Sequence, residues 1–319
     1  MGYGLIPIYI IFFSNYILRK AVSWQKKVFL WLAEVLSILL LAIGVHALEM
    51  PFVAANPLGN LLRLFELGKA YPWQGDMLYW GEYVRAGSLP WHYIATWTVI
   101  VTPVYLLVLW LFSNLLWKEK LMQLLNVALW FNIVIYFAFQ PNIYDGIRHL
   151  LFLLVIITVI ASVTWVRLWQ RGSKSIRLVL SVTLALYIVS VSLQYNKLHP
   201  YEYVYFNELV GGLPGAGRNF ETDYWGTSYK EAALWLLANF ESSYTTVGIC
   251  GNKEAALYFS NSPLTAVWLP NCEGITDSGA QYIIAYGRNA EWDKVEGTVI
   301  HTVSRDTVPL SKVFLVDQE

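Results

Sequence analysis

The apolar positions of this chain gather into long blocks. Six of these blocks approach the roughly 20 residues that a helix needs to cross the hydrocarbon core of a bilayer. They cover residues 3–18, 28–48, 93–116, 122–139, 150–169 and 176–195. The first block is short and has no basic lead, so it does not resemble a secretory signal. We therefore predict an all-α transmembrane bundle of about six helices over residues 1–195.

Basic residues divide the connections between these blocks into two groups. The connections 19–27, 117–121 and 167–177 hold ten lysines and arginines, whereas 49–92 and 140–149 hold only four. Such a bias is typical of cytoplasmic loops in the first group. It predicts that both termini, the loop at 49–92 and the chain from residue 196 onward lie on the extracytoplasmic side of the cell membrane.

The pattern changes at residue 196, where charges, glycines and turn residues become frequent. Short apolar runs there predict strands, and two segments with helical spacing predict helices. The strands are expected at TTVGIC, LTAVWL, QYIIAY, GTVIHTVSR and KVFLVD, and the helices at SYKEAALWLLANF and KEAALYF. Ser228 and Glu231 form a capping-box pattern in the first helix. Residues 196–319 are therefore expected to form a small extracytoplasmic α/β domain with a partly parallel sheet.

The outer loop at 49–92 has an amphipathic part, LGNLLRLFELGKAY, in which leucines recur at helical spacing. A helix of this kind either lies in the plane of the membrane interface or packs on the bundle as a loop helix. The pattern favours neither alternative.

Composition agrees with a membrane protein. Hydrophobic residues make up 56% of the 319 residues and charged residues 14%, with a mean hydropathy of +0.45. A soluble domain is nearer about a quarter charged. The formal net charge is zero, which argues against a nucleic-acid partner and leaves membrane lipid as the expected one.

The two cysteines of the chain both lie in the tail. Cys250 ends the first predicted strand, and Cys272 lies just past the second. If these strands are parallel neighbours, the sulfurs lie near the same sheet edge, where an oxidising compartment permits a disulfide. Closing the loop would stabilise the domain by about 3 kcal/mol in the chain-entropy model. Two free buried thiols are the alternative, and no Cys or His spacing indicates a metal site.

A short polar break, YDGIRHL, separates two apolar blocks at residues 144–150. Charged groups at a membrane boundary are costly unless they are hydrated or paired, and they are often functional. The guanidinium of Arg148 suits a lipid phosphate, His149 offers a further donor, and Asp145 is placed to hold Arg148. The alternative is that Arg148 and His149 only anchor a helix end at headgroup level.

The segment after the last block, residues 199–236, is rich in side chains that bind sugars. Aromatic rings stack on sugar faces, while carboxylates and amides bind hydroxyls. These residues are Tyr201, Tyr203, Tyr205, Asn207, Asp223, Tyr224 and Trp225. The run GGLPGAG predicts a flexible or tightly turned loop. A structured linker, with the aromatics in its core, is the alternative.

Three stretches resemble the C-terminal half of bacterial GT-C glycosyltransferases, the phospholipid-carrier-dependent enzymes similar to protein O-mannosyltransferases and the lipid A aminoarabinose transferase. They are GEYVRAGSLPWHYIATWTVIVTP, YDGIRHLLFLL and HPYEYVYFNELVGGLPGAGRNFETDYWGTSYKEA, about a quarter of the chain. The resemblance implies transfer of a sugar from a polyprenyl-phosphate carrier to an acceptor at the outer leaflet. It implies that Arg148, His149 and Asp145 bind the donor phosphate, and that Glu82 joins the sugar- and acceptor-binding residues named above.

The chain departs from the family at the catalytic acid, which the family carries in its first outer loop. The region that holds this acid precedes the stretches found here, so the catalytic residue is unknown, and neither Asp76 nor Glu82 takes its role. A fragment, a split enzyme with a separate N-terminal half, and a degenerate protein are three explanations. A non-catalytic subunit that binds a lipid-linked sugar or a partner is the competing function. A transporter is disfavoured, because apart from Glu34 the apolar blocks carry almost no charge. No cofactor is expected.

Overall fold

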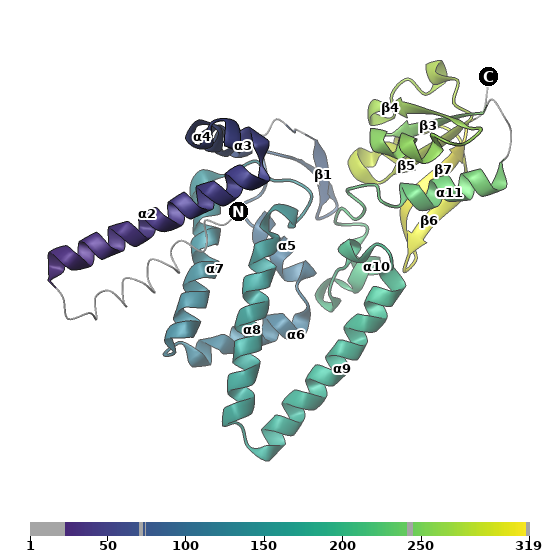
Figure 1. Ribbon diagram of the computed structural model, residues 1–319. Helices are drawn as coiled ribbons and strands as arrows, with labels where there is room; N and C mark the ends of the chain where they lie inside the picture. Colours follow the sequence, from purple (N-terminus) through teal and green to yellow (C-terminus); the bar gives the residue numbers. More distant parts are fainter. Residues whose placement is uncertain (1–22, 70–72, 74, 241–244, 317–319) are drawn as a thin grey trace. The chain divides into compact units, whose positions relative to one another are not determined.

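The computed structural model describes residues 23–69, 73, 75–240 and 245–316. The chain divides into two units, each assembled from separate segments. Of the described residues, the first unit contains 23–69, 73, 106–143 and 150–173, and the second contains 75–105, 144–149, 174–240 and 245–316. Figure 1 shows the helices and strands of both.

Long apolar helices dominate the first unit. They are α2 (Trp24–Glu49), α7 (Lys120–Phe139) and α8 (Leu151–Arg171), with the shorter α3 (Pro51–Ala55) and α4 (Pro57–Lys69). The side chain of Ser23 accepts a hydrogen bond from the amide of Lys26 and caps α2. Pro51 and Pro57 each stand at the first position of a helix, where a missing N–H costs nothing.

Helices α7 and α8 pack against each other through part of their surfaces. Their buried positions include the small residues Ala128, Ala161 and Thr164, which permit close approach. Arg167 and Arg171 of α8 both pair with Glu119, at 3.0 and 2.5 Å, and fasten one end of the pair.

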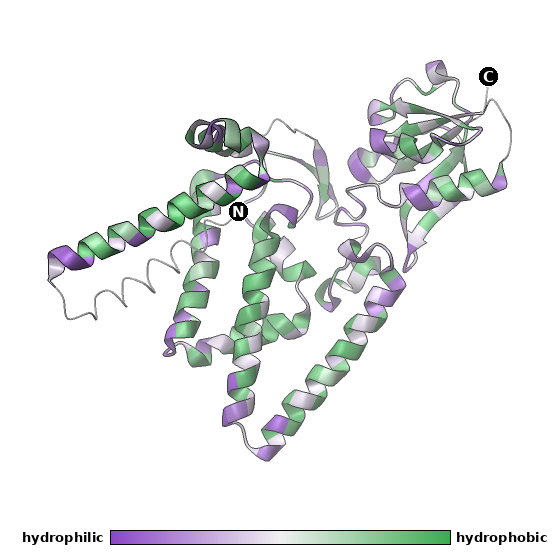
Figure 2. Cartoon of the chain, viewed as in Figure 1, coloured by the Kyte–Doolittle hydropathy of each residue, from purple (hydrophilic) through white to green (hydrophobic). Residues whose placement is uncertain are grey.

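Within the described residues, four helices are long and apolar enough to cross a membrane: α2, α7, the segment Arg148–Arg171, and α9 (Lys174–Leu198) of the second unit. The apolar windows of α2 and α9 contain no buried residue, and Figure 2 shows both helices coloured mostly as hydrophobic between their polar ends. This is expected of helices that meet lipid, and it indicates a membrane protein. The four helices correspond to the predictions at 28–48, 122–139, 150–169 and 176–195.

The predicted span at 93–116 is not one continuous helix, which corrects the sequence analysis. It consists of α5 (Tyr93–Val101), α6 (Val104–Phe112) and the 3-10 turn η2 (Ser113–Leu116). Pro103 lacks an N–H and pushes the preceding residue out of the helical region, and Thr102 is extended with ψ 128°. Counted as one broken span, this segment gives a fifth candidate. The predicted span at 3–18 lies outside the described residues, so six spans and their orientation stay predictions.

The tail contains the predicted small α/β fold. Its sheet has the strand order β4-β3-β5-β7-β6. The strands are β3 (Thr246–Cys250), β4 (Thr265–Leu269), β5 (Tyr282–Tyr286), β6 (Thr298–Arg305) and β7 (Val308–Leu315). The first three are parallel and the last two antiparallel, so the sheet is partly parallel as predicted. Helix α11 (Tyr229–Asn239) packs on β5, β6 and β7.

Three local details of the second unit differ from the sequence analysis. KEAALYF forms the 3-10 segment η6 (Lys253–Phe259) rather than an α-helix. GGLPGAG, predicted as a loop, begins with two left-handed glycines and then forms the short helix α10 (Gly212–Ala216). The hairpin of β1 (Asp76–Tyr79) and β2 (Glu82–Arg85) was not predicted, and its two turn residues, Trp80 and Gly81, both have positive φ.

The tail also contains two smaller groups of 3-10 turns. The turns η4 (Glu202–Val204) and η5 (Glu208–Val210) precede α11, and η7 (Pro270–Cys272) lies between β4 and β5. Two more, η8 (Thr276–Ser278) and η9 (Arg288–Lys294), flank β5. A further turn, η3 (Arg148–Leu150), leads directly into α8.

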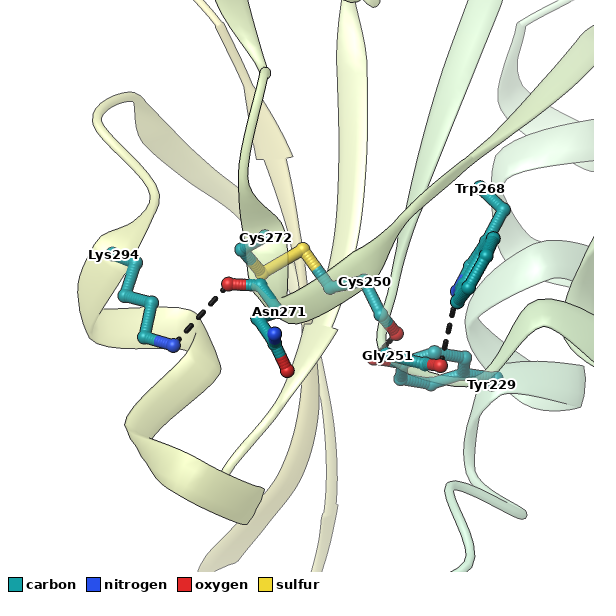
Figure 3. Close-up of a disulfide and its surroundings, with 7 residues drawn as sticks. All are labelled: Tyr229, Cys250, Gly251, Trp268, Asn271, Cys272 and Lys294. Atoms are coloured by element: carbon teal, nitrogen blue, oxygen red, sulfur yellow. Dashed lines mark hydrogen bonds between the residues drawn. A yellow bond between two sulfur atoms is a disulfide. The ribbon is translucent and has the colours of Figure 1, made fainter. Parts of the chain in front are cut away.

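A disulfide joins Cys250 and Cys272 (Figure 3). Parallel pairing of β3 with β4 brings the two sulfurs to one sheet edge, because Cys250 lies beside Leu269 in the register. Both cysteines are buried, and the hydroxyl of Tyr229 donates to the carbonyl of Cys250 over 2.9 Å. The bond fixes the loop that begins at Gly251.

Candidate functional site

The heptapeptide YDGIRHL turns tightly at its second and third residues. Asp145 and Gly146 have φ of +58° and +65°, a left-handed conformation that suits Gly and is tolerated by Asp. The amide of Gly146 donates to the hydroxyl of Tyr93 over 3.1 Å. A side chain at position 146 would meet the ring of Trp97 at 3.2 Å. The turn is therefore held in one conformation by its neighbours.

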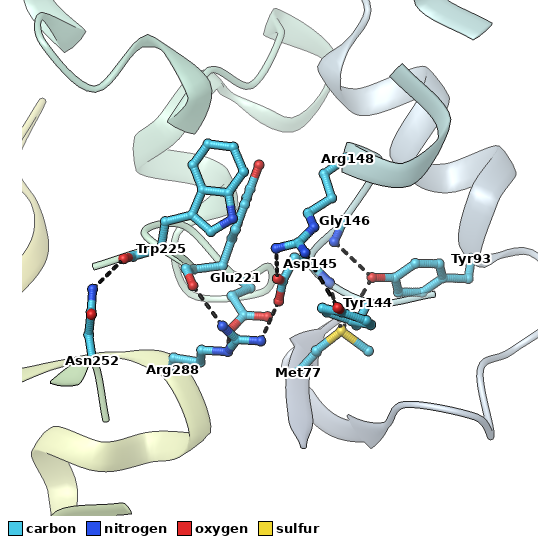
Figure 4. Close-up of polar contacts among 11 residues, drawn as sticks. Met77, Tyr93, Tyr144, Asp145, Gly146, Arg148, Glu221, Trp225, Asn252 and Arg288 are labelled. Atoms are coloured by element: carbon cyan, nitrogen blue, oxygen red, sulfur yellow. Dashed lines mark hydrogen bonds and ion pairs between the residues drawn. The ribbon is translucent and has the colours of Figure 1, made fainter. Parts of the chain in front are cut away.

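Asp145 lies between two arginines, as Figure 4 shows. Its side chain is 0% exposed, and its two oxygens pair with different partners. Oδ2 is 2.6 Å from Nη1 of Arg148, and Oδ1 is 2.5 Å from Nη2 of Arg288. Burial raises the pKa of Asp145, while Arg288 and Arg148 act in the opposite direction. We call Asp145, Arg148, Arg288 and Glu221 the guanidinium cluster.

Arg288 is the inner arginine of the guanidinium cluster. Its side chain is 13% exposed. Nη1 donates to the carbonyl of Tyr224 over 2.8 Å, and Nε lies 3.6 Å from Oε1 of Glu221. Burial opposes its charge, but Asp145 and Glu221 raise the pKa of Arg288. Its donors are thus used to hold the cluster together.

Arg148 is the outer arginine and keeps an open side. Its side chain is 26% exposed, and only one of its nitrogens pairs with Asp145. Nη2 makes a long contact of 3.4 Å with the hydroxyl of Tyr144. The guanidinium carbon lies 4.7 Å from the ring centre of Tyr144 and 5.8 Å from that of Trp225. A fixed, partly exposed guanidinium between two rings is suited to an anionic ligand.

His149 lies beside this guanidinium in the chain. Its ring packs edge-on against Tyr144 with 4.7 Å between ring centres. Its Nε2 is buried and has no hydrogen-bond partner among the residues that the structure describes. The predicted role of His149 in binding the donor phosphate stays a prediction, because this nitrogen is buried.

Tyr224 and Trp225, predicted to bind sugar, do lie next to the cluster. Their rings are 5.3 Å apart, and both also contact Tyr203, at 5.3 and 5.6 Å. Trp225 is 48% exposed, and Asn252, two residues past Cys250, donates to its carbonyl over 2.9 Å. Burial raises the pKa of Tyr224 to about 12. The indole is thus an exposed aromatic face on a fixed backbone.

Asp223 has a different environment from the one the sequence suggested. Its carboxylate accepts hydrogen bonds from the amides of Thr227 and Ser228, both at 3.0 Å, and from the hydroxyls of Ser228 and Tyr203. Ser228 therefore does not form the predicted capping box, because its hydroxyl is bonded to Asp223 and makes no cap of its own. Asp223 acts as the anchor of the turn that leads into α11.

Tyr201 and Asn207, also predicted to bind sugar, are buried and engaged. The hydroxyl of Tyr201 donates to Glu231 over 2.9 Å, and Glu231 in turn pairs with Arg305 at 2.6 Å. The side-chain amide of Asn207 donates to the backbone carbonyls of Val99 and Thr102, both at 2.6 Å. Asn207 therefore satisfies backbone groups released at the Pro103 break.

The two remaining residues of the predicted sugar set also lie apart from the bonds of the cluster. Tyr205 is buried with its ring 5.3 Å from that of Tyr195. Glu82 is exposed in the β1–β2 hairpin, and among the described residues it forms no ion pair with Arg148 or Arg288.

Two buried acids near Arg288 were missed by the sequence analysis. Glu221 is 6% exposed, and neither of its oxygens has a hydrogen bond in the described part of the chain. Burial raises its pKa to about 8, against the influence of Arg288. Burial also raises the pKa of Glu291 to about 7. Arg288 itself follows β5 at the carboxyl edge of the parallel strands, a position that often carries function and that could have been noted from the sequence.

Among the described residues, no group of three or more His, Cys, Asp or Glu side chains is arranged to hold a metal ion. Comparison with family models, curated proteins and solved structures finds no significant match for this chain.

Proposed function

We propose that this chain is a membrane glycosyltransferase, or the C-terminal portion of one, that takes a sugar from a polyprenyl-phosphate carrier. The cluster would bind the phosphate of the carrier at the outer leaflet. The three stretches that resemble GT-C glycosyltransferases support this proposal. YDGIRHL and FETDYWG, which contribute Asp145, Arg148 and Glu221, are parts of those stretches, and the fold brings them into one cluster.

The observation that carries the proposal is the setting of Arg148. Its guanidinium is held by Asp145 on one side and remains 26% exposed on the other. It stands at the first residue of the candidate span Arg148–Arg171, and if this helix crosses the membrane its first residue would lie near the headgroups, where a lipid phosphate is found. A guanidinium fixed in advance binds phosphate with little further ordering, because the cost of orienting it is met by folding.

The phosphate site would also support the transfer reaction. The carrier phosphate is the leaving group, and it gains negative charge as the bond to the sugar breaks. Donors aimed at such a group stabilise the transition state more than the ground state. Arg148 would supply this stabilisation through its partly exposed guanidinium. Trp225 offers an exposed ring beside the guanidinium on which a sugar can stack.

The test is binding of a long-chain polyprenyl phosphate to the full chain in lipid nanodiscs. Arg148→Ala should weaken binding about 10- to 100-fold, the value of a charge-assisted hydrogen bond of about 1.5–3 kcal/mol. Arg148→Lys should recover only part of the affinity, because it keeps the charge but loses the planar fork.

The matched control is Arg63→Ala. Arg63 is an exposed arginine of α4, in another predicted outer loop. Its replacement should leave the affinity unchanged, and the corresponding polyprenol without phosphate should bind the wild type and Arg148→Ala equally. Equal losses in Arg148→Ala and Arg63→Ala would refute the proposed phosphate site.

A further inference from the structure

A cavity of about 480 Å³ lies in the second unit. Arg288, which forms an ion pair with Asp145, is one of the residues that line it. Its volume is within the range of small-molecule sites, about 300–1,000 Å³. It is lined by the β1–β2 hairpin, the end of α10, residues 220–223, the start of η9 and the β6–β7 turn. It shares Glu221 and Arg288 with the guanidinium cluster, but neither Asp145 nor Arg148 lines it.

The floor of the cavity contains an acid whose hydrogen-bonding capacity is unused. Glu221 lines the cavity and is 6% exposed, yet neither carboxyl oxygen has a hydrogen bond among the described residues. A buried polar group without a partner is costly and rare, so each case needs a physical reason. The ion pair between Nε of Arg288 and Oε1 of Glu221 is long, at 3.6 Å, and the Nη atoms of Arg288 donate elsewhere, to Asp145 and to the carbonyl of Tyr224. A ligand with hydroxyl groups would supply the missing partners.

The backbone around Glu221 is fixed before any ligand arrives. The amide of Glu221 donates to the carbonyl of Leu78 over 3.0 Å, and the amide of Gly81 donates to that of Asn219 over 2.9 Å. The ring of Phe220 packs on Tyr79 and Trp97, with ring centres 5.8 and 5.7 Å apart. The site is therefore preorganised, which lowers the cost of binding.

The walls of the cavity combine aromatic and polar groups. Tyr83 and Trp292 contribute rings, and Lys312 lies 4.4 Å from the ring centre of Trp292. Arg218 is an exposed arginine on the lining, and no carboxylate of the described residues pairs with it. Aromatic rings beside hydrogen-bonding side chains are the groups that commonly bind a sugar ring.

We infer that this cavity binds a neutral, hydroxyl-rich saccharide, with Glu221 and Arg218 bonding its hydroxyls and Tyr83 and Trp292 contacting its ring. Burial raises the pKa of Glu221, which favours the protonated form of the carboxyl. A protonated carboxyl both donates and accepts, which matches a hydroxyl better than a cation. The cavity thus differs in chemistry from the phosphate site at Arg148.

Arg288 connects the two sites, because it lines the cavity and also bonds Asp145, the partner of Arg148. If the proposed function holds, the cavity is where the saccharide acceptor binds, and this assignment rests on that proposal. That the cavity binds a saccharide does not depend on the proposed function, and it is tested separately.

The experiment is saturation-transfer NMR of the full chain in nanodiscs with D-glucose, D-mannose, D-galactose and L-arabinose as probes. At least one of these sugars should show saturation transfer from the protein. Arg218→Ala and Glu221→Ala should each weaken its binding about tenfold, whereas Glu221→Gln should keep it at neutral pH, because glutamine also donates and accepts. Arg85→Ala, an exposed arginine at the end of β2, is the matched control and should change nothing.

The outcomes separate this inference from the proposed function. Arg148→Ala should weaken polyprenyl-phosphate binding about 10- to 100-fold and leave sugar binding intact, while Arg218→Ala should weaken sugar binding about tenfold and leave polyprenyl-phosphate binding intact. No transfer to any of the four sugars, or equal transfer in Arg218→Ala and the wild type, would overturn the inference. Inorganic phosphate provides a further test. If its ³¹P resonance broadens in the presence of the wild type but not of Arg218→Ala, the cavity is an anion site, and the inference is overturned.

Discussion

Two buried aspartates of the second unit show how differently one residue type is used. Asp223 accepts hydrogen bonds from the backbone amides of Thr227 and Ser228 and from three hydroxyls. All of these donors except the hydroxyl of Tyr203 lie within five residues of Asp223 in the chain. Asp145 instead binds two guanidiniums, one of them from 143 residues away. The first fixes a local turn, and the second joins distant segments around charge.

The difference decides which groups remain for a ligand. The donors around Asp223 are backbone amides and hydroxyls that already bond its carboxylate, and the structure shows no cation paired with it among the described residues. Around Asp145 one of the two donors, Arg148, is 26% exposed and has nitrogens that are not bound to the carboxylate. The hydrogen-bond and ion-pair partners of a buried acid therefore indicate whether it serves ligand binding or the stability of the fold. An acid that holds an exposed cation positions a ligand group, and an acid surrounded by amides stabilises the fold.

The largest effect should follow from removing the carboxylate of Asp145. Asp145→Ala leaves two neighbouring guanidiniums without their shared counter-charge, and the free energy of unfolding should fall by about 3–5 kcal/mol. Asp145→Asn should lose less, because asparagine tolerates the left-handed backbone that alanine does not. Chemical denaturation in detergent measures both. A loss below about 1 kcal/mol for Asp145→Ala would mean that the cluster is not bonded as described.

The next effect concerns Glu221 and has a defined pH dependence. Its pKa is raised by burial from 4.5 to about 8, so the folded protein keeps a proton that the unfolded chain releases. Stability is therefore lost as the pH rises from about 4.5 to about 8 and is constant above that range.

Glu221→Gln should remove this loss. The variant should be more stable than the wild type at pH above 8, by on the order of a few kcal/mol, and the two should converge near the acidic end. Unfolding curves across the pH range check this. Glu291, whose pKa is also raised by burial, stays in both proteins and gives a common slope up to about pH 7. Parallel curves for the two proteins would show that Glu221 is ionised at neutral pH.

A smaller effect is expected from Asp223→Ala. It leaves the amides of Thr227 and Ser228 without their acceptor, and should lower the free energy of unfolding by about 1–3 kcal/mol. The guanidinium cluster keeps its bonds in this variant. Asp223→Asn, which retains one acceptor oxygen, should lose less. A folded Asp223→Ala protein that fails to bind ligand would restore the sugar-binding role suggested by the sequence.

The sequence allowed much of the fold to be predicted because its patterns are local. The apolar blocks gave α2, α7, α8 and α9, and alternation with turn residues gave the strands of the sheet. Pro103 was a visible signal for the break in the predicted span at 93–116, but the apolar residues on both sides concealed it. The β1–β2 hairpin was missed because its strands have four residues each and little apolar alternation.

The site was only partly predictable, since its bonds cross long separations. The spacing of Asp145 and Arg148 suggested their ion pair, which the structure contains. Nothing in the sequence indicated that Arg288 would lie on the other oxygen of Asp145, or that Glu221 would be buried while Asp223, two residues on, would be used as a cap. Burial of a polar side chain depends on what packs around it, and that is decided by tertiary structure.

The most direct test compares Arg148→Ala with Asp223→Ala in one binding experiment with a long-chain polyprenyl phosphate. Arg148→Ala should lose affinity about 10- to 100-fold with little change in stability, and Asp223→Ala should lose stability and keep the affinity of the wild type. If both variants bind as the wild type does, or if the affinity falls only in Asp223→Ala, the guanidinium cluster is not a phosphate site.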